Sequence, residues 1–179
     1  KCQSQLLNQR MRELWKHSIK VAALSYVLAK RFKQFNADEA MSIGLLHDIG
    51  VAAILNNASS YPEMAADPAA VDLAIHQLRG PFGSRILRSW RFAEEYIEAA
   101  QQAENWMRKG EGPPDYCDLL IVAQLHSFVG TDHALAVPPL DQVPAMPRLN
   151  LGELTPHHSL AILEAAQEQI EETESLLIL

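Results

Sequence analysis

Cysteine is scarce in this chain of 179 residues, which contains only Cys2 and Cys117. The two cysteines form no CxxC pair or other metal-ligand spacing, which excludes a zinc finger and indicates a reducing compartment. No stretch approaches the roughly 18 apolar residues that a membrane helix needs, and no signal peptide is visible. These absences predict a cytoplasmic protein that does not cross a membrane.

Long runs of Lys and Arg are also absent, and the formal net charge is -7. Phosphate contacts need clustered basic groups, so nucleic acid is not an expected partner. We interpret the densest basic group as the solvated face of a helix; it comprises Lys16, Lys20, Lys30, Arg31 and Lys33. Because 48% of the residues are hydrophobic and 21% are charged, the composition is that of a folded globular domain.

The alternation of apolar and polar residues that marks strands does not stand out, and no internal repeat is visible. Apolar residues instead recur at steps of three and four, which predicts helices. Asn36 and Glu39 form a capping-box pattern, Gly50 suits a helix exit, and Gly80-Pro81 suits a helix end. The predicted helices cover residues 6–35, 37–47, 51–55, 67–80, 82–90, 93–109 and 115–129, with a last helix that Thr155-Pro156 caps and that ends near Leu177. The fold class is therefore all-α, a multi-helix bundle in one domain over residues 1–179.

Proline is concentrated in residues 137–147, which hold four of the 10 prolines. Four prolines resist regular secondary structure, so this segment is predicted to be an extended arm on the surface. The arm either crosses the bundle or offers a strand to which a partner protein docks.

His47 and Asp48 are adjacent at the end of an apolar helical run. An imidazole and a carboxylate placed where a helix end meets the core can bind a divalent metal. The alternative is that the pair only caps the helix and ties the core through backbone groups. His17 and His126 lie in other predicted helices, and His126 is either a ligand or a core residue paired with Asp48 or Asp118.

Residues 41–50 resemble the GLLHDIGK signature of metal-dependent phosphohydrolases of the HD superfamily, with Val51 in place of the lysine. Together with Leu14-Trp15-Lys16-His17-Ser18 and with Gly83, Leu87 and Trp90, they resemble the HDOD family, the HD-related output domain of bacterial signalling proteins. The resemblance extends from about Arg10 onward. HDOD domains normally carry a further helical segment before this point, so we expect the chain, which begins at Lys1, to be the HD-like half of such a domain. Apolar surface exposed by the missing segment is a reason to expect self-association.

The resemblance also implies which residues would bind metal. An HD hydrolase holds one or two divalent metals with an early His, the doublet and a later Asp. His17, His47 and Asp48 match the first three positions, and His126 stands where the Asp is expected, which is a departure but not a loss because His can ligate transition metals. In two-metal relatives that cleave cyclic di-GMP, two further histidines occur, whereas this chain has Arg79 and Ala103-Glu104 there and lacks the GYP triad. His76 lies one helical turn, about 5 Å, from Arg79 and is a poor substitute. The resemblance thus implies a degenerate metal site with no catalytic residue assigned.

The first functional hypothesis is a non-catalytic bacterial signal-transduction module that acts on a signalling partner or on fused domains and needs no cofactor. The alternative is an atypical metal-dependent phosphohydrolase or phosphodiesterase that uses Fe, Mn or Zn. A third hypothesis is a sensor that binds a nucleotide or small anion at Arg79 without cleaving it.

Overall fold

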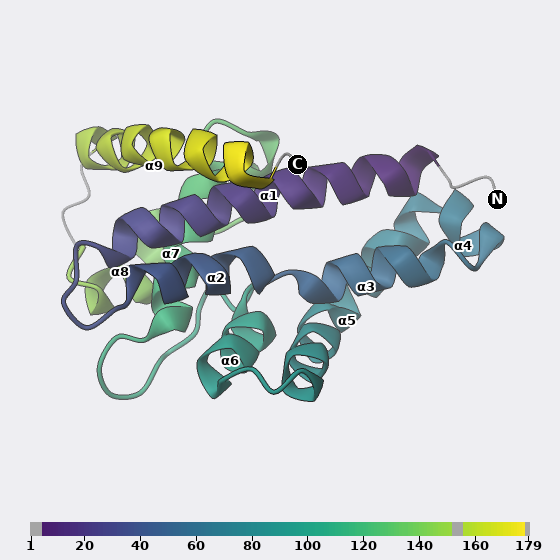
Figure 1. Cartoon of the computed structure of the whole chain (residues 1–179), viewed down its shortest axis with the longest axis horizontal. Helices are drawn as coiled ribbons and strands as arrows, with labels where there is room; N and C mark the ends of the chain where they lie inside the picture. The colour runs from purple at the N-terminus through teal and green to yellow at the C-terminus, as the bar shows by residue number, and fades with distance from the viewer. Residues whose placement is uncertain (1–4, 152–155, 178–179) are drawn as a thin grey trace.

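A computed structural model describes residues 5–151 and 156–177, and every regular element in these ranges is helical (Figure 1). The α-helices are α1 (Gln5–Ala29), α2 (Ala37–Leu46), α3 (Ile49–Ala58), α4 (Pro62–Ala66), α5 (Pro68–Ser89), α6 (Glu94–Gln102), α7 (Tyr116–Phe128), α8 (Ala145–Arg148) and α9 (Pro156–Leu177); the 3₁₀ turns are η1 (Asp132–Leu135) and η2 (Leu140–Gln142). The all-α prediction is confirmed. Within the described ranges, no helix has both the length and the apolar character required to cross a membrane.

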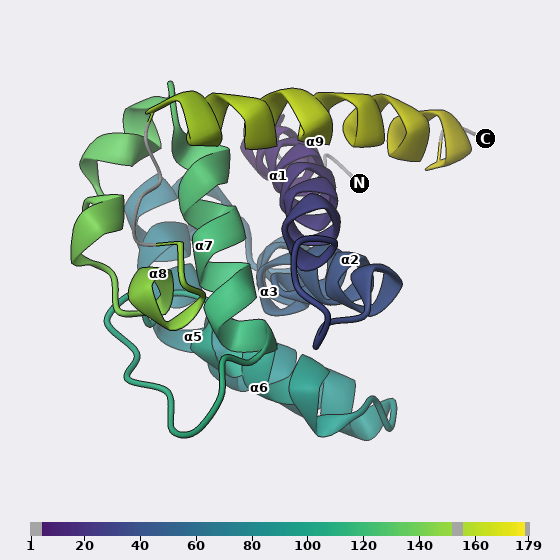
Figure 2. The same cartoon turned by 90° about the vertical axis from the view of Figure 1, so that its left-hand side faces the viewer.

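The long helix α1 organises the bundle. It packs against α2, α7 and α9, whereas α3 packs mainly against α5, and α5 packs in turn against α6. Figure 1 shows α2 and α3 following one another beneath α1, and Figure 2 shows α9 passing across the end of α7. The junction between α2 and α3 therefore faces the middle of α1.

The core is divided at this junction. The larger cluster joins the second half of α1 to α2 and α7, and α7 is buried continuously from Cys117 to Ser127. A smaller cluster joins Leu7 at the start of α1 to α3 and α5. A third cluster of Leu87, Ile97 and Ala100 packs against Leu46 and Ile49 at the junction itself. Polar side chains at the α2–α3 junction can therefore meet one another away from bulk water.

Gly50 does not form the exit of a helix, as the sequence predicted, but is the second residue of α3. A Cβ atom at this position would collide with the carbonyl oxygen of Arg79 and would lie 2.7 Å from the backbone nitrogen of Gly83. The glycine therefore permits the backbones of α3 and α5 to approach each other. Glycine is required at position 50 because two helices pack closely there, and not because a helix ends there.

The predicted break at Gly80-Pro81 is also wrong, because α5 continues through both residues to Ser89. Proline lacks the N–H that would bond to the carbonyl of Gln77, but both Pro81 and Gln77 are exposed, so water can reach that carbonyl. Packing against α3 and α6 holds the helix together. Other boundaries moved inward: α1 ends at Ala29 and α6 at Gln102, while the predicted cap Thr155 lies outside the described residues.

The proline-rich segment is not an extended surface arm. It forms η2 and α8, and Val143, Ala145 and Met146 are buried in the larger cluster. Arg148 of α8 donates from Nε to Asp118 Oδ2 at 3.0 Å, and Asp118 is itself fully buried at the start of α7. Apolar burial and this ion pair stabilise a compact conformation that the proline content alone did not suggest.

Candidate metal centre at the α2–α3 junction

His47 and Asp48 form the short link between two helices. His47 is the C-cap of α2, and Asp48 occupies the N-cap position of α3 without making a side-chain capping bond. His47 Nδ1 lies 2.7 Å from the carbonyl oxygen of Gly44. Because a carbonyl only accepts, Nδ1 carries the proton, and Nε2 presents a lone pair. The Asp48 carboxylate, free of the capping role, points into the same space.

His17 of α1 completes a group of three potential ligands. One ligand atom from each of His17, His47 and Asp48 lies within 4.8 Å of the others. Asp48 Oδ2 is 3.4 Å from His47 Nε2 and 3.9 Å from His17 Nε2. His47 Nε2 is fully buried and has no hydrogen-bond partner. A buried lone pair without a partner is energetically costly, which makes this nitrogen an available ligand.

Arg79 of α5 binds the other oxygen of the same carboxylate. Its Nη2 contacts Asp48 Oδ1, and its Nη1 contacts Glu104 Oε1, so one guanidinium links two carboxylates. The Asp48 side chain is 5% exposed and that of Arg79 is 14% exposed. Charge pairs in such surroundings are strong only when geometry and hydrogen bonding are good, and a guanidinium supplies both. The centre therefore already contains a fixed cation.

Burial sets the protonation states of the group. Burial, followed by the neighbouring His47, lowers the pKa of His17 to about 3. Burial also lowers the pKa of His47. Burial by itself would raise the pKa of Asp48, but electrostatic interactions with His47 and Arg79 outweigh it and hold that pKa at about 2. At neutral pH the two histidines are neutral and the carboxylate is ionised, which are the forms that bind metal.

A cavity of about 580 Å³ opens beside these residues and is lined by His17, Asp48, Arg79 and Glu104. The ring of Phe128 stacks on His17 with ring centroids 5.4 Å apart and also on His133 at 5.7 Å. His133 is exposed, as the sequence predicted, yet it contributes to this wall. Three rings from α1, the end of α7 and η1 thus form one side of the cavity.

The structure does not bring His126 into this group. His126 is fully buried in α7, and its Nδ1 lies 2.8 Å from the carbonyl oxygen of Val122. Neither Asp48 nor Asp118, both of which are among the described residues, pairs with it: Asp48 binds Arg79, and Asp118 binds Arg108 and Arg148. The prediction of a core residue is closer to this environment than that of a fourth ligand. Among the described residues, no fourth ligand from a later helix lies beside the other three.

His126 should make stability depend on pH. Burial lowers the pKa of His126 from the ordinary value of 6.5. As the pH falls below that value, His126 becomes protonated in the unfolded chain but stays neutral in the folded chain. The contribution of His126 to the free energy of unfolding is therefore fully present above pH 6.5 and is lost as the pH falls below that value. We expect His126→Asn to reduce the slope of unfolding free energy against pH by up to about 1.4 kcal/mol per pH unit.

Urea unfolding between pH 7 and pH 5 measures this slope. His76→Asn, at an exposed position of α5, is the matched control. Equal slopes of unfolding free energy against pH in the wild type and His126→Asn would contradict the assignment of His126 as a core residue that stays neutral in the folded state.

The donor set fits one transition metal. Two neutral imidazoles and a carboxylate are the three protein ligands of many catalytic zinc and iron sites, in which water fills the remaining positions. His17, His47 and Asp48 would hold such an ion, and the unpartnered Nε2 of His47 is the observation that supports the fit. A second ion next to Asp48 would meet Arg79, because the guanidinium lies on that side of the carboxylate.

Arg79 and Glu104 were identified in the sequence as positions without an expected histidine, but the binding of Arg79 to both Glu104 and Asp48 was not predicted. The pairing joins α3, α5 and the residues after α6, which are far apart in sequence. Opposite charges at 79 and 104 were the available signal, but two charges of opposite sign are too common to predict a contact.

The sequence and the structure were compared with those of known proteins. The HDOD domain family model matches residues 2–106. A crystal structure of a protein from Shewanella amazonensis, provisionally described as a metal-dependent phosphohydrolase, aligns with a TM-score of 0.71 at 20% identity and covers 90% of this chain. The chain spans 60% of the length of that protein. No curated protein matches the chain significantly. Because the family model covers more than half of the residues, including the His47-Asp48 doublet, the chain belongs to the HDOD domain family.

Proposed function

We propose that this domain is a non-catalytic module of bacterial signal transduction that acts through contacts with a partner protein or with fused domains. The observation that carries the proposal is the guanidinium of Arg79 between Asp48 and Glu104. A hydrolytic HD site uses its aspartate to hold metal, but here one oxygen of that aspartate is bound to a protein cation. Membership of the HDOD family supports the signalling part of the proposal, because the sequence resemblance implies that role.

Charge balance supports the same conclusion. With neutral histidines, the charges at the centre are those of Asp48, Glu104 and Arg79, so one positive charge already offsets one of the two carboxylates. Phosphodiester cleavage by a metal pair requires divalent ions to stabilise both the attacking and the leaving oxygen. A guanidinium cannot bind water as a ligand, so Arg79 does not replace the metal ion that activates water in such enzymes.

The second candidate is a metal-dependent phosphohydrolase or phosphodiesterase with one ion on His17, His47 and Asp48. The buried, unpartnered Nε2 of His47 favours it, and the description of the Shewanella protein is consistent with it. A bound ion would polarise a phosphoryl oxygen and activate water. The chain's own contribution would be two oriented imidazoles and a carboxylate whose second oxygen Arg79 fixes.

The anion-sensor hypothesis is less well supported. Arg79 was the residue expected to bind an anion, but both of its Nη atoms contact carboxylates. An incoming phosphate would have to displace Asp48 or Glu104 before it could bind. No other specific observation favours this function.

Metal content measured by elemental analysis discriminates the first two functions. The protein is purified without chelators or an affinity tag, as wild type, His47→Ala, Asp48→Ala and the surface control His76→Ala. The proposal predicts Fe, Mn and Zn well below one ion per chain in all four proteins. It also predicts no hydrolysis of bis-p-nitrophenyl phosphate above the blank after each metal is added.

Near-stoichiometric metal in the wild type and in His76→Ala that is lost from both doublet variants would reject the non-catalytic reading of the site. Metal-dependent hydrolysis that disappears in the same two variants would establish the second candidate. Substoichiometric metal that is equal in all four proteins would show adventitious binding elsewhere and leave the proposal intact.

A further inference from the structure

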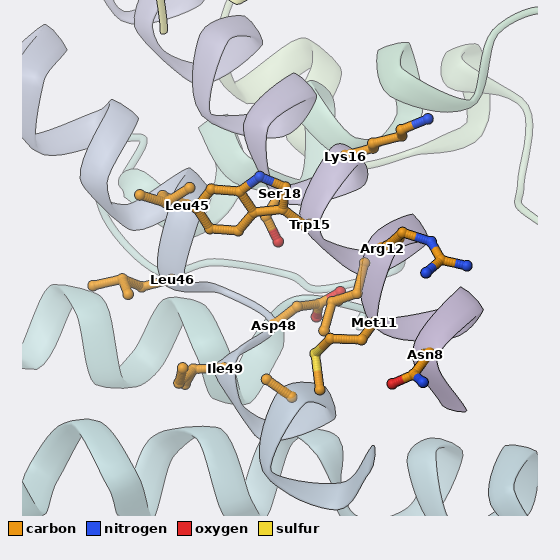
Figure 3. Close-up of a pocket in the computed structure, with 12 residues that line it drawn as sticks. Asn8, Met11, Arg12, Trp15, Lys16, Ser18, Leu45, Leu46, Asp48 and Ile49 are labelled. Carbon is orange, nitrogen blue, oxygen red and sulfur yellow. The ribbon is translucent and has the colours of Figure 1, made fainter. Parts of the chain in front are cut away.

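An apolar groove of about 790 Å³ lies between another face of α1 and the α2–α3 junction (Figure 3). Met11 and Trp15 form its wall on α1, and Leu45, Leu46 and Ile49 form the opposite wall. The Trp15 side of the groove is open, because this residue is 48% exposed. A half-exposed tryptophan above a row of aliphatic side chains is typical of a surface that a partner covers.

The lining favours a helix as the occupant. An extended peptide must bond its backbone N–H and C=O groups to a partner, and the described part of this chain has no strand edge to offer. The groove walls are mostly apolar, so an extended backbone would lose its bonds to water without replacement. A helix satisfies its own backbone groups and presents only side chains. From Asn8 to Ser18 the wall on α1 is about 15 Å long, which accommodates roughly three helical turns.

Charge at the rim selects the chemistry of that helix. Arg12 and Lys16 are exposed, lie one turn apart on α1 and line the groove. Neither has an ion-pair partner among the residues whose side chains the structure describes, whereas the nearby Arg10 is bound to Asp72 and Lys20 to the carbonyl of Ser127. Figure 3 shows both side chains extending outward from α1. In a chain of formal net charge -7, Arg12 and Lys16 therefore form a basic edge beside an apolar surface.

We propose that this groove docks an amphipathic helix of a partner protein, with aliphatic residues against Trp15 and Ile49 and acidic residues against Arg12 and Lys16. The inference rests on the proposed function, because it supplies the surface through which a signalling module would act. Asp48 lines both this groove and the cavity of the candidate metal centre. The proposed docking surface thus adjoins the Asp48–Arg79 pair.

Two fluorescein-labelled peptides of 15 residues test the proposal. Both have leucine at i, i+3, i+4, i+7 and i+11; one has glutamate at the flanking positions and the other has lysine. Binding to the full chain is measured by fluorescence anisotropy at low salt. We expect the glutamate peptide to bind at least about threefold more tightly, since two partly exposed ion pairs contribute on this scale.

Charge reversal provides the specific variant. Arg12→Glu/Lys16→Glu should reverse the preference, so that the lysine peptide binds more tightly. Lys33→Glu/Lys109→Glu changes the net charge by the same amount at exposed positions outside the groove and should keep the wild-type order. Trp15→Ala should weaken both peptides by about tenfold, as expected of an aromatic anchor, and thermal unfolding checks that each variant is folded.

The proposal would be overturned by absence of binding, by equal affinity for the two peptides, or by an order of affinities that Arg12→Glu/Lys16→Glu does not change. A dimer seen by sedimentation that dissociates in that variant would show that a second copy of the chain fills the groove, which also overturns it. Peptide binding requires neither metal nor turnover. Failure here would therefore leave the non-catalytic proposal standing, while stoichiometric metal would reject that proposal without affecting the groove.

Discussion

Gly50→Ala is expected to lower the free energy of unfolding by about 3 kcal/mol, because overpacking between two backbones cannot be relieved by a side-chain rotation. The added Cβ would meet the carbonyl oxygen of Arg79 and lie 2.7 Å from the backbone nitrogen of Gly83. The two helices would have to separate, and the small cluster between α3 and α5 would lose contact. Urea unfolding followed by circular dichroism measures the loss.

Gly83→Ala is the matched control on the facing helix. A Cβ at position 83 would find its nearest neighbour, the Cβ of Ala100, at 3.4 Å, which is an ordinary contact. Alanine also has the better helix propensity, by about 1 kcal/mol, so this variant should be neutral or more stable. If Gly50→Ala and Gly83→Ala had similar stabilities, the close approach of α3 and α5 would not be the reason for glycine at position 50.

The Asp48–Arg79 pair should show strong energetic coupling. Arg79→Met leaves a buried carboxylate without its cation, and Asp48→Asn leaves the guanidinium with Glu104 alone. Each single change is expected to lower the free energy of unfolding by about 3 kcal/mol, because it leaves the remaining buried charge without its partner. The double variant Asp48→Asn/Arg79→Met should be more stable than the sum of the single costs predicts, by at least about 2 kcal/mol.

A surface pair calibrates this double-mutant cycle. Arg88 and Glu94 are 3.3 Å apart with side chains 64% and 71% exposed, so their coupling should not exceed about 0.5 kcal/mol. Additive effects of the Asp48 and Arg79 substitutions would mean that the guanidinium is not the counter-ion of the aspartate. The proposed function would then lose the observation that carries it.

Gly50 and the Asp48–Arg79 pair belong to the same contact between α3 and α5. Gly50 allows α3 to touch the backbone of α5 at Arg79, and the side chain of Arg79 reaches back to Asp48 at the start of α3. The HD doublet and the following glycine are therefore linked through α5. The HD doublet is thus retained here beside an arginine, with Asp48 bound to the guanidinium of Arg79.

The local elements were predictable from the sequence. Helical periodicity identified α1, α2 and α7, and the capping pattern at Asn36 was confirmed by its bonds to the backbone nitrogens of Asp38 and Glu39. The doublet and His17 were also predicted to share a site, and the structure places them together. The helices and the cap depend on residues within one or two turns of each other. The shared site of His17 and the doublet was predicted from the resemblance to a known family.

Tertiary structure alone decided the rest. Pro81 continues a helix because α3 and α6 support it, and residues 137–147 fold compactly because Arg148 binds Asp118. The ion pairs of Arg79 join α5 to Asp48 and to Glu104, positions that only helix packing brings together. A sequence determines helices by short-range backbone bonds and periodic burial, whereas the partner of a buried charge depends on which helices pack side by side. The sequence by itself thus determined the helical fold and the His47-Asp48 doublet, and the packing of α3, α5 and α6 determined that the doublet faces an arginine.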